Sequence, residues 1–225
     1  MHDVLGDART VVNVGAGTGS YEPTDRPVIP IGPSTAMALQ RHPRLPPAVL
    51  GVAESLPLAD GTVDAAMAVL SLHHWTDPER GLAELTRVAR RRTVLLTIDP
   101  EVEAQMWLFQ HYVPEILEQD RRDFPAVEHL AGLLKAPTQV ITVPVPADCA
   151  DGFGLAFWSR PEAVLDPGAR AATSGFARMD KDREAAAVAR FADHLRSGAW
   201  DQAHGHLRTL PALDVGLRLL VTEVT

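Results

Sequence analysis

The sequence lacks the features that mark secreted and membrane-spanning chains. Cys149 is the single cysteine among 225 residues, so an internal disulfide is impossible and a reducing compartment is expected. No apolar run approaches the roughly 20 residues that a membrane-spanning helix needs, and nothing at Met1 resembles a signal peptide. We therefore expect a cytoplasmic protein that does not enter the membrane.

Positive charge is also scarce. The chain carries 29 acidic and 21 basic residues, for a net charge of −8, whereas a nucleic-acid-binding surface requires a basic stripe. Nucleic acid is therefore not an expected partner. Arg90, Arg91 and Arg92 form the compact basic run of the chain, and we interpret it as the C-terminal end of a helix, where cations are favoured.

The composition that remains is that of a globular protein. Apolar residues make up 46% and charged residues 22% of the chain, which is the ordinary range. The length suffices for one sizeable α/β domain with a small appended cap. We therefore expect a single domain over residues 1–225.

The first half alternates strand and helix patterns. Short apolar, β-branched runs predict strands at Thr10–Val14, Val28–Ile31, Val49–Val52, Val63–Leu72 and Thr93–Ile98. Ser34 is suited to cap a helix between the second and third of these, and Asp77-Pro78 to begin one after the fourth. Strands that alternate with helices predict a doubly wound, mostly parallel sheet with helices on both faces.

The second half is less regular. Residues 101–134 look mainly helical, with breaks near Pro114 and Pro125, and residues 139–145 read as a strand. Residues 151–178 are aromatic and interrupted by glycine and proline. A helix is predicted over 181–196 and a final strand over 215–224. We expect residues 101–178 to form a helical, aromatic cap that covers the carboxyl ends of the strands on the substrate side.

A glycine motif directly follows the first predicted strand. In Val11-Val12-Asn13-Val14-Gly15-Ala16-Gly17-Thr18-Gly19, three glycines stand at alternate positions, where they allow a tight turn and a close approach of the backbone to a ligand. Ser20 occupies the place of the last glycine in the dinucleotide-binding fingerprint. This substitution disfavours NAD or FAD as the ligand.

Further motifs follow in a fixed order. They are Gly51-Val52-Ala53-Glu54-Ser55-Leu56-Pro57-Leu58, then Asp60-Gly61-Thr62-Val63-Asp64-Ala65, then Leu72-His73-His74-Trp75-Thr76-Asp77, and then Leu82-Ala83-Glu84-Leu85-Thr86-Arg87-Val88-Ala89-Arg90. Together with the glycine motif, residues 10–99 resemble the class I S-adenosylmethionine-dependent methyltransferases of the UbiE-like (methyltransferase type 11) group. The resemblance implies a Rossmann-like fold, S-adenosylmethionine as cofactor and S-adenosylhomocysteine as product.

The resemblance also implies cofactor contacts at the ends of the first four strands. Around the methionine moiety these are Asn13, Gly15, Ala16, Gly17, Leu70 and Ser71. Around the ribose and adenine they are Gly32, Pro33, Ala53 and Glu54. A parallel sheet is consistent with this arrangement, because its ligands gather outside the carboxyl ends of the strands.

The chain departs from the family pattern at the second strand. Members usually end that strand with an acidic residue that binds both ribose hydroxyls, and this chain has Gly32. Losing that acceptor should weaken cofactor binding by about 1.5–3 kcal/mol, unless Glu22 or Asp25 replaces it. Only nine residues precede the first predicted strand, where members usually carry a helix over the cofactor, so we expect a more open site.

The candidates for catalysis are histidines. Methyl transfer is an in-line displacement, so the enzyme mainly positions the acceptor, and an oxygen or nitrogen acceptor also needs a base. His73 and His74 follow the fourth predicted strand and can serve as that base. The alternative is structural, with a ring bonded to a loop carbonyl above Trp75. Asp99 could orient the substrate, but we interpret it as a helix cap. No metal site is expected.

Two aromatic groups lie in the second half. They consist of Trp107, Phe109, His111 and Tyr112, and of Phe153, Phe157, Trp158 and Phe176. Such groups form a protein core more often than a pocket, although aromatic walls also line small-molecule sites. A planar or hydrophobic small-molecule acceptor would suit them.

Two rival functions stay open at this point. The first is a protein with the methyltransferase fold that no longer transfers methyl groups and binds a small molecule or catalyses another reaction; Gly32 favours it. The second is a nucleotide-dependent oxidoreductase, which Ser20 and the missing acidic residue after the second strand disfavour.

Overall fold

The computed structural model describes residues 2–224. By its internal contacts the chain divides into two compact units. The first unit contains the described residues up to Ile98, Pro125–Ile141, and those from Arg218 onward, and the second contains Asp99–Phe124 and Thr142–Leu217. In this described part of the chain, no helix is both long and apolar enough to cross a membrane.

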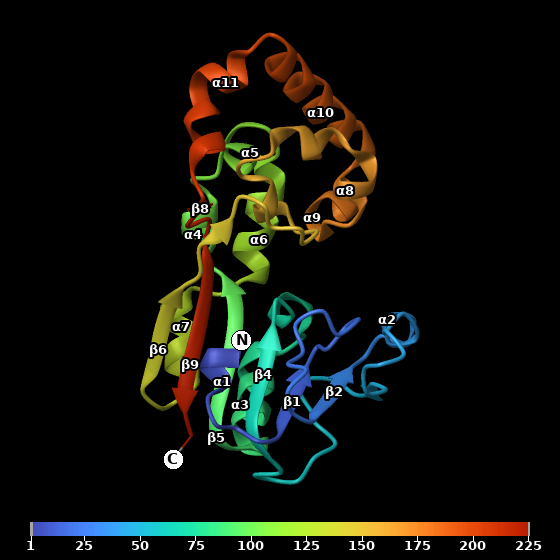
Figure 1. Ribbon diagram of the computed structural model, residues 1–225, viewed down its shortest axis with the longest axis vertical. Coiled ribbons are helices and arrows are strands. Elements are labelled where there is room, and N and C mark those ends of the chain that lie inside the picture. Colours follow the sequence, from blue (N-terminus) through green and yellow to red (C-terminus); the bar gives the residue numbers. More distant parts are fainter. Residues whose placement is uncertain (1, 225) are drawn as a thin grey trace. The chain divides into compact units, whose positions relative to one another are not determined.

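The first unit is built on a seven-stranded sheet with the order β3-β2-β1-β4-β5-β9-β6 among the described residues. The strands are β1 (Val11–Val14), β2 (Val28–Gly32), β3 (Val49–Leu50), β4 (Val63–Val69), β5 (Ala89–Ile98), β6 (Thr138–Thr142) and β9 (Leu217–Glu223). The pairs from β3 to β5 are parallel, and β9 runs opposite to β5 (Figure 1). The predicted doubly wound, mostly parallel α/β fold is confirmed.

The two central strands are buried on both faces. All four residues of β1 are buried, and Val12 pairs in register with Ala66 of β4. Ala65, Ala66 and Ala68 of β4 have no exposed surface. A parallel strand that is covered on both sides reads as a continuous apolar run, which is why the sequence predicts these strands so directly.

Five helical segments belong to the described first unit. They are α1 (His2–Leu5), α2 (Thr35–Leu39), η1 (Leu72–His74), α3 (Pro78–Val88) and α7 (Val127–Leu133). The predicted caps are confirmed: the Ser34 side chain accepts from Met37 N at 3.2 Å, and Asp77 Oδ1 accepts from Arg80 N at 3.0 Å. Each cap satisfies a backbone N–H that the first turn of a helix leaves without a partner.

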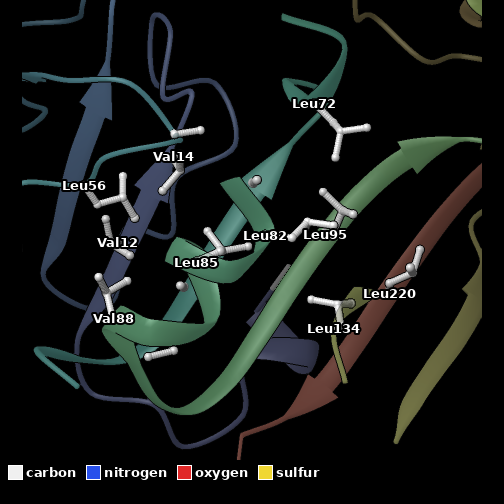
Figure 2. Packing of buried hydrophobic residues seen from close by; sticks show 14 of the residues in the cluster. Val12, Val14, Leu56, Leu72, Leu82, Leu85, Val88, Leu95, Leu134 and Leu220 are labelled. Atoms are coloured by element: carbon white, nitrogen blue, oxygen red, sulfur yellow. The ribbon is translucent and has the colours of Figure 1, made fainter. Parts of the chain in front are cut away.

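The core of the first unit gathers around α3. Leu82, Leu85 and Val88 recur at a spacing of three along α3 and are fully buried, which is the pattern of one buried helical face. Figure 2 shows Leu82 beside Leu95 of β5, and Leu220 of β9 belongs to the same buried cluster. Burial of such a side chain stabilises a fold by about 1.5–3 kcal/mol. Figures 1 and 2 place α1 on the opposite face of the sheet.

The interpretation of the arginine run as a helix end is wrong. Helix α3 ends at Val88, and its C-cap Ala89 is already extended, so Arg90, Arg91 and Arg92 lie in β5. Each guanidinium pairs with a carboxylate of the first unit. The acids are Asp64 at 2.9 Å for Arg90, Asp7 at 2.8 Å for Arg91, and Glu223 for Arg92. These arginines are therefore stabilised by ion pairs with neighbouring segments, and not by the dipole of a helix.

Other predicted boundaries shift in the first unit. The third strand covers Val49–Leu50 and not Val49–Val52, and the fifth begins at Ala89, four residues before the predicted start. Residues 15–27, all of them described, connect β1 to β2 through turns and bends without a helix.

The second unit is mainly helical. Its described elements are α4 (Pro100–Glu103), α5 (Trp107–His111), α6 (Pro114–Asp123), β7 (Val145–Pro146), η2 (Gly154–Phe157), η3 (Pro161–Leu165), α8 (Pro167–Ala171), α9 (Ser174–Arg178), α10 (Lys181–Arg196), α11 (Ala199–His204), η4 (Gly205–Thr209) and β8 (Ala212–Leu213). The predicted helix over 181–196 is confirmed at both ends. Asp99 Oδ1 accepts from Glu101 N at 3.1 Å, so Asp99 caps α4 as interpreted.

Aromatic rings form the core of the second unit. Trp107 stacks on Phe191 with centroids 5.3 Å apart and contacts Trp200 edge to face at 5.3 Å. Its Nε1 donates to the carbonyl of Trp158 at 2.9 Å. Most members of the two predicted aromatic groups are buried here. The interpretation of these residues as core is therefore confirmed for all but His111, which is exposed, and Phe153, which is half-buried.

A pair of carboxyl groups is buried in the second unit. Glu103 is 1% exposed and Asp120 is 8% exposed, and Arg178 Nη2 lies 3.9 Å from Asp120 Oδ1. Burial, then the charge of Asp120 and a hydrogen bond to it, raise the pKa of Glu103 to about 9. Burial also raises the pKa of Asp120. Glu103 is therefore the protonated partner at neutral pH, and Asp120 accepts its proton in a hydrogen bond.

This pair should make the protein less stable in mild alkali. The folded-state pKa of Glu103 lies above its ordinary value of 4.5, so the unfolded chain loses this proton first and the free energy of unfolding falls as pH rises from 4.5 to about 9. Glu103→Gln cannot ionise and should flatten the decline between about pH 7 and pH 9. Urea unfolding at each pH, followed by tryptophan fluorescence, measures this free energy of unfolding.

Glu101→Gln on the same helix is the matched control. Glu101 forms an exposed ion pair with Arg121 at 3.0 Å, and such pairs contribute little to stability. The free energy of unfolding of Glu101→Gln should change with pH as it does in the unmodified protein. An equally steep alkaline decline in Glu103→Gln would show that another group is responsible.

Candidate functional site

The glycine loop turns back over the end of β2. Gly15, Gly17 and Gly19 have φ angles of +76°, +51° and +91°, a region that favours glycine because it has no Cβ. The backbone N–H groups of Gly15 and Ala16 both donate to the carbonyl of Ile31, at 2.8 and 3.0 Å. The loop thus lies against the carboxyl end of β2.

The ends of β1 and β4 meet beside this loop. A Cβ on Gly15 would lie 2.3 Å from Cβ of Ser71, so a side chain cannot be accommodated at position 15. Ser71 is buried and donates through Oγ to the carbonyl of Val14 at 3.1 Å. Leu70 has a φ of +48°, which is rare for a residue with a side chain. Such strained residues cluster at functional sites.

Gly32 ends β2 next to the glycine loop. A Cβ built on it would lie 3.6 Å from Ala16 N and 3.9 Å from Gly17 N, which is ordinary van der Waals contact. Its φ is outside the left-handed region, since it is not among the positive-φ glycines of the described chain. The backbone at position 32 therefore tolerates a side chain, and that side chain would begin beside the loop.

The two proposed replacements for the missing acid, Glu22 and Asp25, differ in their surroundings. Both oxygens of Glu22 are engaged: Oε1 accepts from Asn13 Nδ2 at 3.1 Å and Oε2 accepts from Arg41 Nη2 at 2.7 Å. The Glu22 side chain is only 1% exposed. Asp25 pairs with Arg26 at 2.9 Å. Glu22 is therefore excluded as the replacement, whereas a replacement by Asp25, whose side chain is 48% exposed, stays a prediction.

Pro33 and α2 continue from Gly32. Pro33 precedes the N-cap Ser34, and the Met37 side chain in α2 extends toward the loop, since its Cε would be 3.2 Å from a Cβ on Gly17. Met37 itself is 44% exposed. The sequence motif offers no signal for this contact, because α2 shows no buried face that fixes its orientation.

Ala53 and Glu54 lie after β3. Ala53 is buried, and Glu54 Oε1 accepts from Thr76 N at 2.7 Å, from Thr76 Oγ1 at 3.0 Å and from Asp77 N at 3.1 Å. Burial alone would raise the pKa of Glu54, but these hydrogen bonds keep it below the ordinary value. The Glu54 carboxylate therefore holds the turn before α3.

The two histidines lie in the short helix η1, which follows Ser71. Their ring centroids are 3.8 Å apart and tilted by 50°. His73 is partly buried and His74 is exposed. Trp75 packs against the start of α3, where a Cβ on Gly81 would lie 2.4 Å from its ring. The histidines thus stand one turn beyond the junction of β1 and β4.

The structure brings most predicted cofactor residues together. Gly15, Ala16, Gly17, Gly32, Leu70 and Ser71 meet at the carboxyl ends of β1, β2 and β4, with Asn13 directly below. The chain passes from β1 to β2 and β3 on one side and to β4 and β5 on the other. Ligands of open α/β sheets bind at this change of direction. Fold and site together define a Rossmann-like ligand-binding domain.

Comparison with known proteins identifies the family. A family model described as "Methyltransferase domain" matches residues 12–97. The crystal structure of a candidate methyltransferase from an antibiotic biosynthesis pathway of Anabaena variabilis superposes with a TM-score of 0.88 at 30% identity, over 95% of this chain and 90% of that one. The chain therefore belongs to the class I S-adenosylmethionine-dependent methyltransferases of the type 11 group.

Two further relatives agree. A methyltransferase of Mycobacterium tuberculosis, described as uncharacterized, is 40% identical over 91 residues, which are 37% of this chain and 36% of that protein. The match thus spans about a third of the length of this curated relative. A SAM-dependent methyltransferase of Thermotoga maritima is 25% identical with a TM-score of 0.51, over 62% of this chain and 68% of that one.

The glycine loop yields a prediction with a built-in control. Gly17→Ala should abolish the binding of S-adenosylhomocysteine, because a Cβ there enters the space between the loop and Met37. Gly61→Ala is the control, since Gly61 has a φ of +55°, close to the +51° of Gly17, but lies in a turn outside this site. Both should destabilise the fold by about 1–2 kcal/mol.

Calorimetry measures the loss of ligand binding, and thermal unfolding measures the loss of stability. Unfolding should shift to a similar extent in both variants, and only Gly17→Ala should lose binding. Unchanged affinity in a folded Gly17→Ala protein would show that the cofactor does not approach the loop.

Proposed function

We propose that this protein transfers the methyl group of S-adenosylmethionine to a small-molecule acceptor, and that the cofactor lies at the carboxyl ends of β1, β2 and β4. One observation carries the proposal: the glycine loop closes onto the Ile31 carbonyl directly above Asn13, whose buried Oδ1 has no hydrogen-bond partner among the described residues. We further propose a cytoplasmic location, in keeping with the single cysteine.

The residues present fit the methionine end of the cofactor. A buried acceptor without a donor costs about 1–3 kcal/mol, and the ammonium group of a methionine moiety would supply that donor to Asn13. Gly15, Ala16 and Gly17 present backbone without large side chains, so a ligand can approach it closely. Leu70 and Ser71 complete this end from β4.

The fit is weaker at the ribose. Gly32 offers no carboxylate, and Pro33 can provide only apolar contact beside it. We propose Ala53 and the backbone of Glu54 as contacts of the adenine, since the Glu54 carboxylate is already engaged with Thr76 and Asp77. The cofactor should therefore be held chiefly by its methionine and adenine ends.

The bound cofactor would supply an electrophilic methyl group on a sulfonium. The task of the chain is then to orient the acceptor and to remove its proton. We propose His73 as the base, because it is partly buried and follows the Ser71 junction, with His74 as the exposed alternative. The histidine would take the proton that the acceptor atom releases on receiving the methyl group.

A small-molecule acceptor is supported by charge and by one relative. The net charge of −8 disfavours nucleic acid as a substrate. The Thermotoga maritima relative is described as a candidate histamine N-methyltransferase, so a small amine is one acceptor class to test. The role of residues 101–178 as the substrate-side cap stays a prediction, as does any contribution of their aromatic side chains.

Calorimetric titration tests the proposal against its rivals. S-adenosylhomocysteine should bind and NAD should not. Binding of NAD alone would favour the oxidoreductase, and binding of S-adenosylhomocysteine without methyl transfer to any of a panel of small amines, phenols and carboxylates would favour a non-catalytic protein.

The ribose contact gives a gain-of-function prediction. The unmodified protein should bind S-adenosylhomocysteine in the high-micromolar range. Gly32→Glu should tighten binding about 10-fold to 100-fold, because a hydrogen bond to a charged group is worth about 1.5–3 kcal/mol. Gly32→Gln, of equal length without the charge, should gain less. Low-micromolar binding by the unmodified chain, with no improvement in Gly32→Glu, would mean that another group already holds the ribose.

The base assignment is tested with an acceptor in hand. His73→Asn should lower kcat about 10²-fold to 10⁴-fold for an acceptor that must lose a proton, while the affinity for S-adenosylhomocysteine stays unchanged. His74→Asn is the matched control and should keep most activity. The opposite ranking of the two variants would move the role to His74.

A further inference from the structure

A buried ion pair lies beneath the glycine loop. Arg41 Nη2 and Glu22 Oε2 are 2.7 Å apart, and their side chains are 4% and 1% exposed. Glu22 comes from the connection between β1 and β2, and Arg41 follows α2. A buried ion pair often stabilises a fold no more than apolar residues of the same volume, so its presence here calls for a role other than stability.

Glu22 fixes the orientation of Asn13. A carboxylate can only accept hydrogen bonds, so the group of Asn13 that faces Glu22 Oε1 at 3.1 Å must be the amide nitrogen. The carboxamide oxygen of Asn13 therefore faces away from Glu22, buried and without a partner among the residues described. With a neutral donor in place of Glu22, the amide could rotate and present nitrogen where it now presents oxygen.

Arg41 holds the loop itself. Its Nη1 donates to the carbonyl of Gly17 at 3.3 Å, and its Nε donates to the carbonyl of Pro46 at 3.0 Å. The guanidinium also lies close under Gly19, where a Cβ would be 3.0 Å from Nη1. One rigid, planar group thus joins Glu22, the glycine loop and the segment before β3.

We propose that the Glu22–Arg41 pair positions the cofactor site: through Asn13 it presents an acceptor oxygen to the ammonium group of the cofactor's methionine moiety, and through Gly17 it fixes the loop. This inference rests on the proposed function. Glu22 and Arg41 are positioning residues, because they act through Asn13 and Gly17.

The test first reverses the direction of the hydrogen bond between residues 13 and 22. A double variant then restores an acceptor oxygen at position 13 toward the ligand. In Glu22→Gln the new amide can accept from Arg41 with its oxygen and donate to position 13 with its nitrogen. Asn13 must then rotate its oxygen toward residue 22 and its nitrogen toward the ligand, so affinity for S-adenosylhomocysteine should fall by about 10-fold to 100-fold. The double variant Asn13→Asp/Glu22→Gln should recover most of it, since aspartate accepts on both sides.

Calorimetry measures the affinities, and thermal unfolding of each ligand-free variant checks the fold. Glu184→Gln is the matched control: Glu184 pairs with Arg170 at 2.8 Å, both side chains are 13% exposed, and the pair lies in the second unit. Glu184→Gln should lose stability and keep its affinity for S-adenosylhomocysteine. Rescue in the double variant is the result that a purely structural role would not produce.

The outcomes separate this inference from the proposed function. Unchanged affinity in Glu22→Gln, or no recovery in a folded double variant, overturns the positioning role while the unmodified protein still binds S-adenosylhomocysteine. No binding by the unmodified protein overturns the proposed function and this inference together. Should Glu22→Gln unfold, the double variant alone decides, because the role requires it to bind about as tightly as the unmodified protein.

Discussion

The site depends on one carbonyl oxygen. The Ile31 carbonyl accepts from the backbone N–H groups of both Gly15 and Ala16. These two hydrogen bonds hold the loop after β1 against the end of β2. Two donors can converge on one oxygen only if the chain turns sharply, and Gly15 turns with a left-handed backbone that lies against Ser71. This turn brings the loop beside Gly32 and against Ser71, which follows β4.

The charged residues of the region that matches the family model, residues 12–97, divide into two kinds. Some maintain the scaffold: Glu84 accepts from Leu56 N at 2.8 Å and pairs with Arg87, which also reaches Asp60 at 2.7 Å. These bonds fasten the segment after β3 to α3. Others, such as Glu22, lie at the ligand side of the sheet. Motif similarity alone does not distinguish the two kinds, whereas hydrogen-bond partners do.

Much of the fold could be predicted because its signals are local. Continuous apolar runs reveal buried parallel strands, and Asp77-Pro78 marks the start of α3 within its own first turn. Three features could not be predicted: two depend on residues far apart in the chain, and the third has no signal in the sequence. The partners of Arg90 to Arg92 lie in three separate segments, Arg41 is 19 residues from Glu22, and the left-handed backbone of Leu70 has no compositional signal.

The two edge strands of the sheet are short, and prolines stand beside both. Strand β3 has two residues and follows Pro46-Pro47, and β6 lies between Pro137 and Pro144. Proline lacks the N–H that an added strand would require. Exposed edges of a sheet are templates for aggregation, and the apolar Val49, Leu50 and Val140 are exposed at these edges. The prolines therefore limit each exposed edge to the few residues that an added strand could pair with.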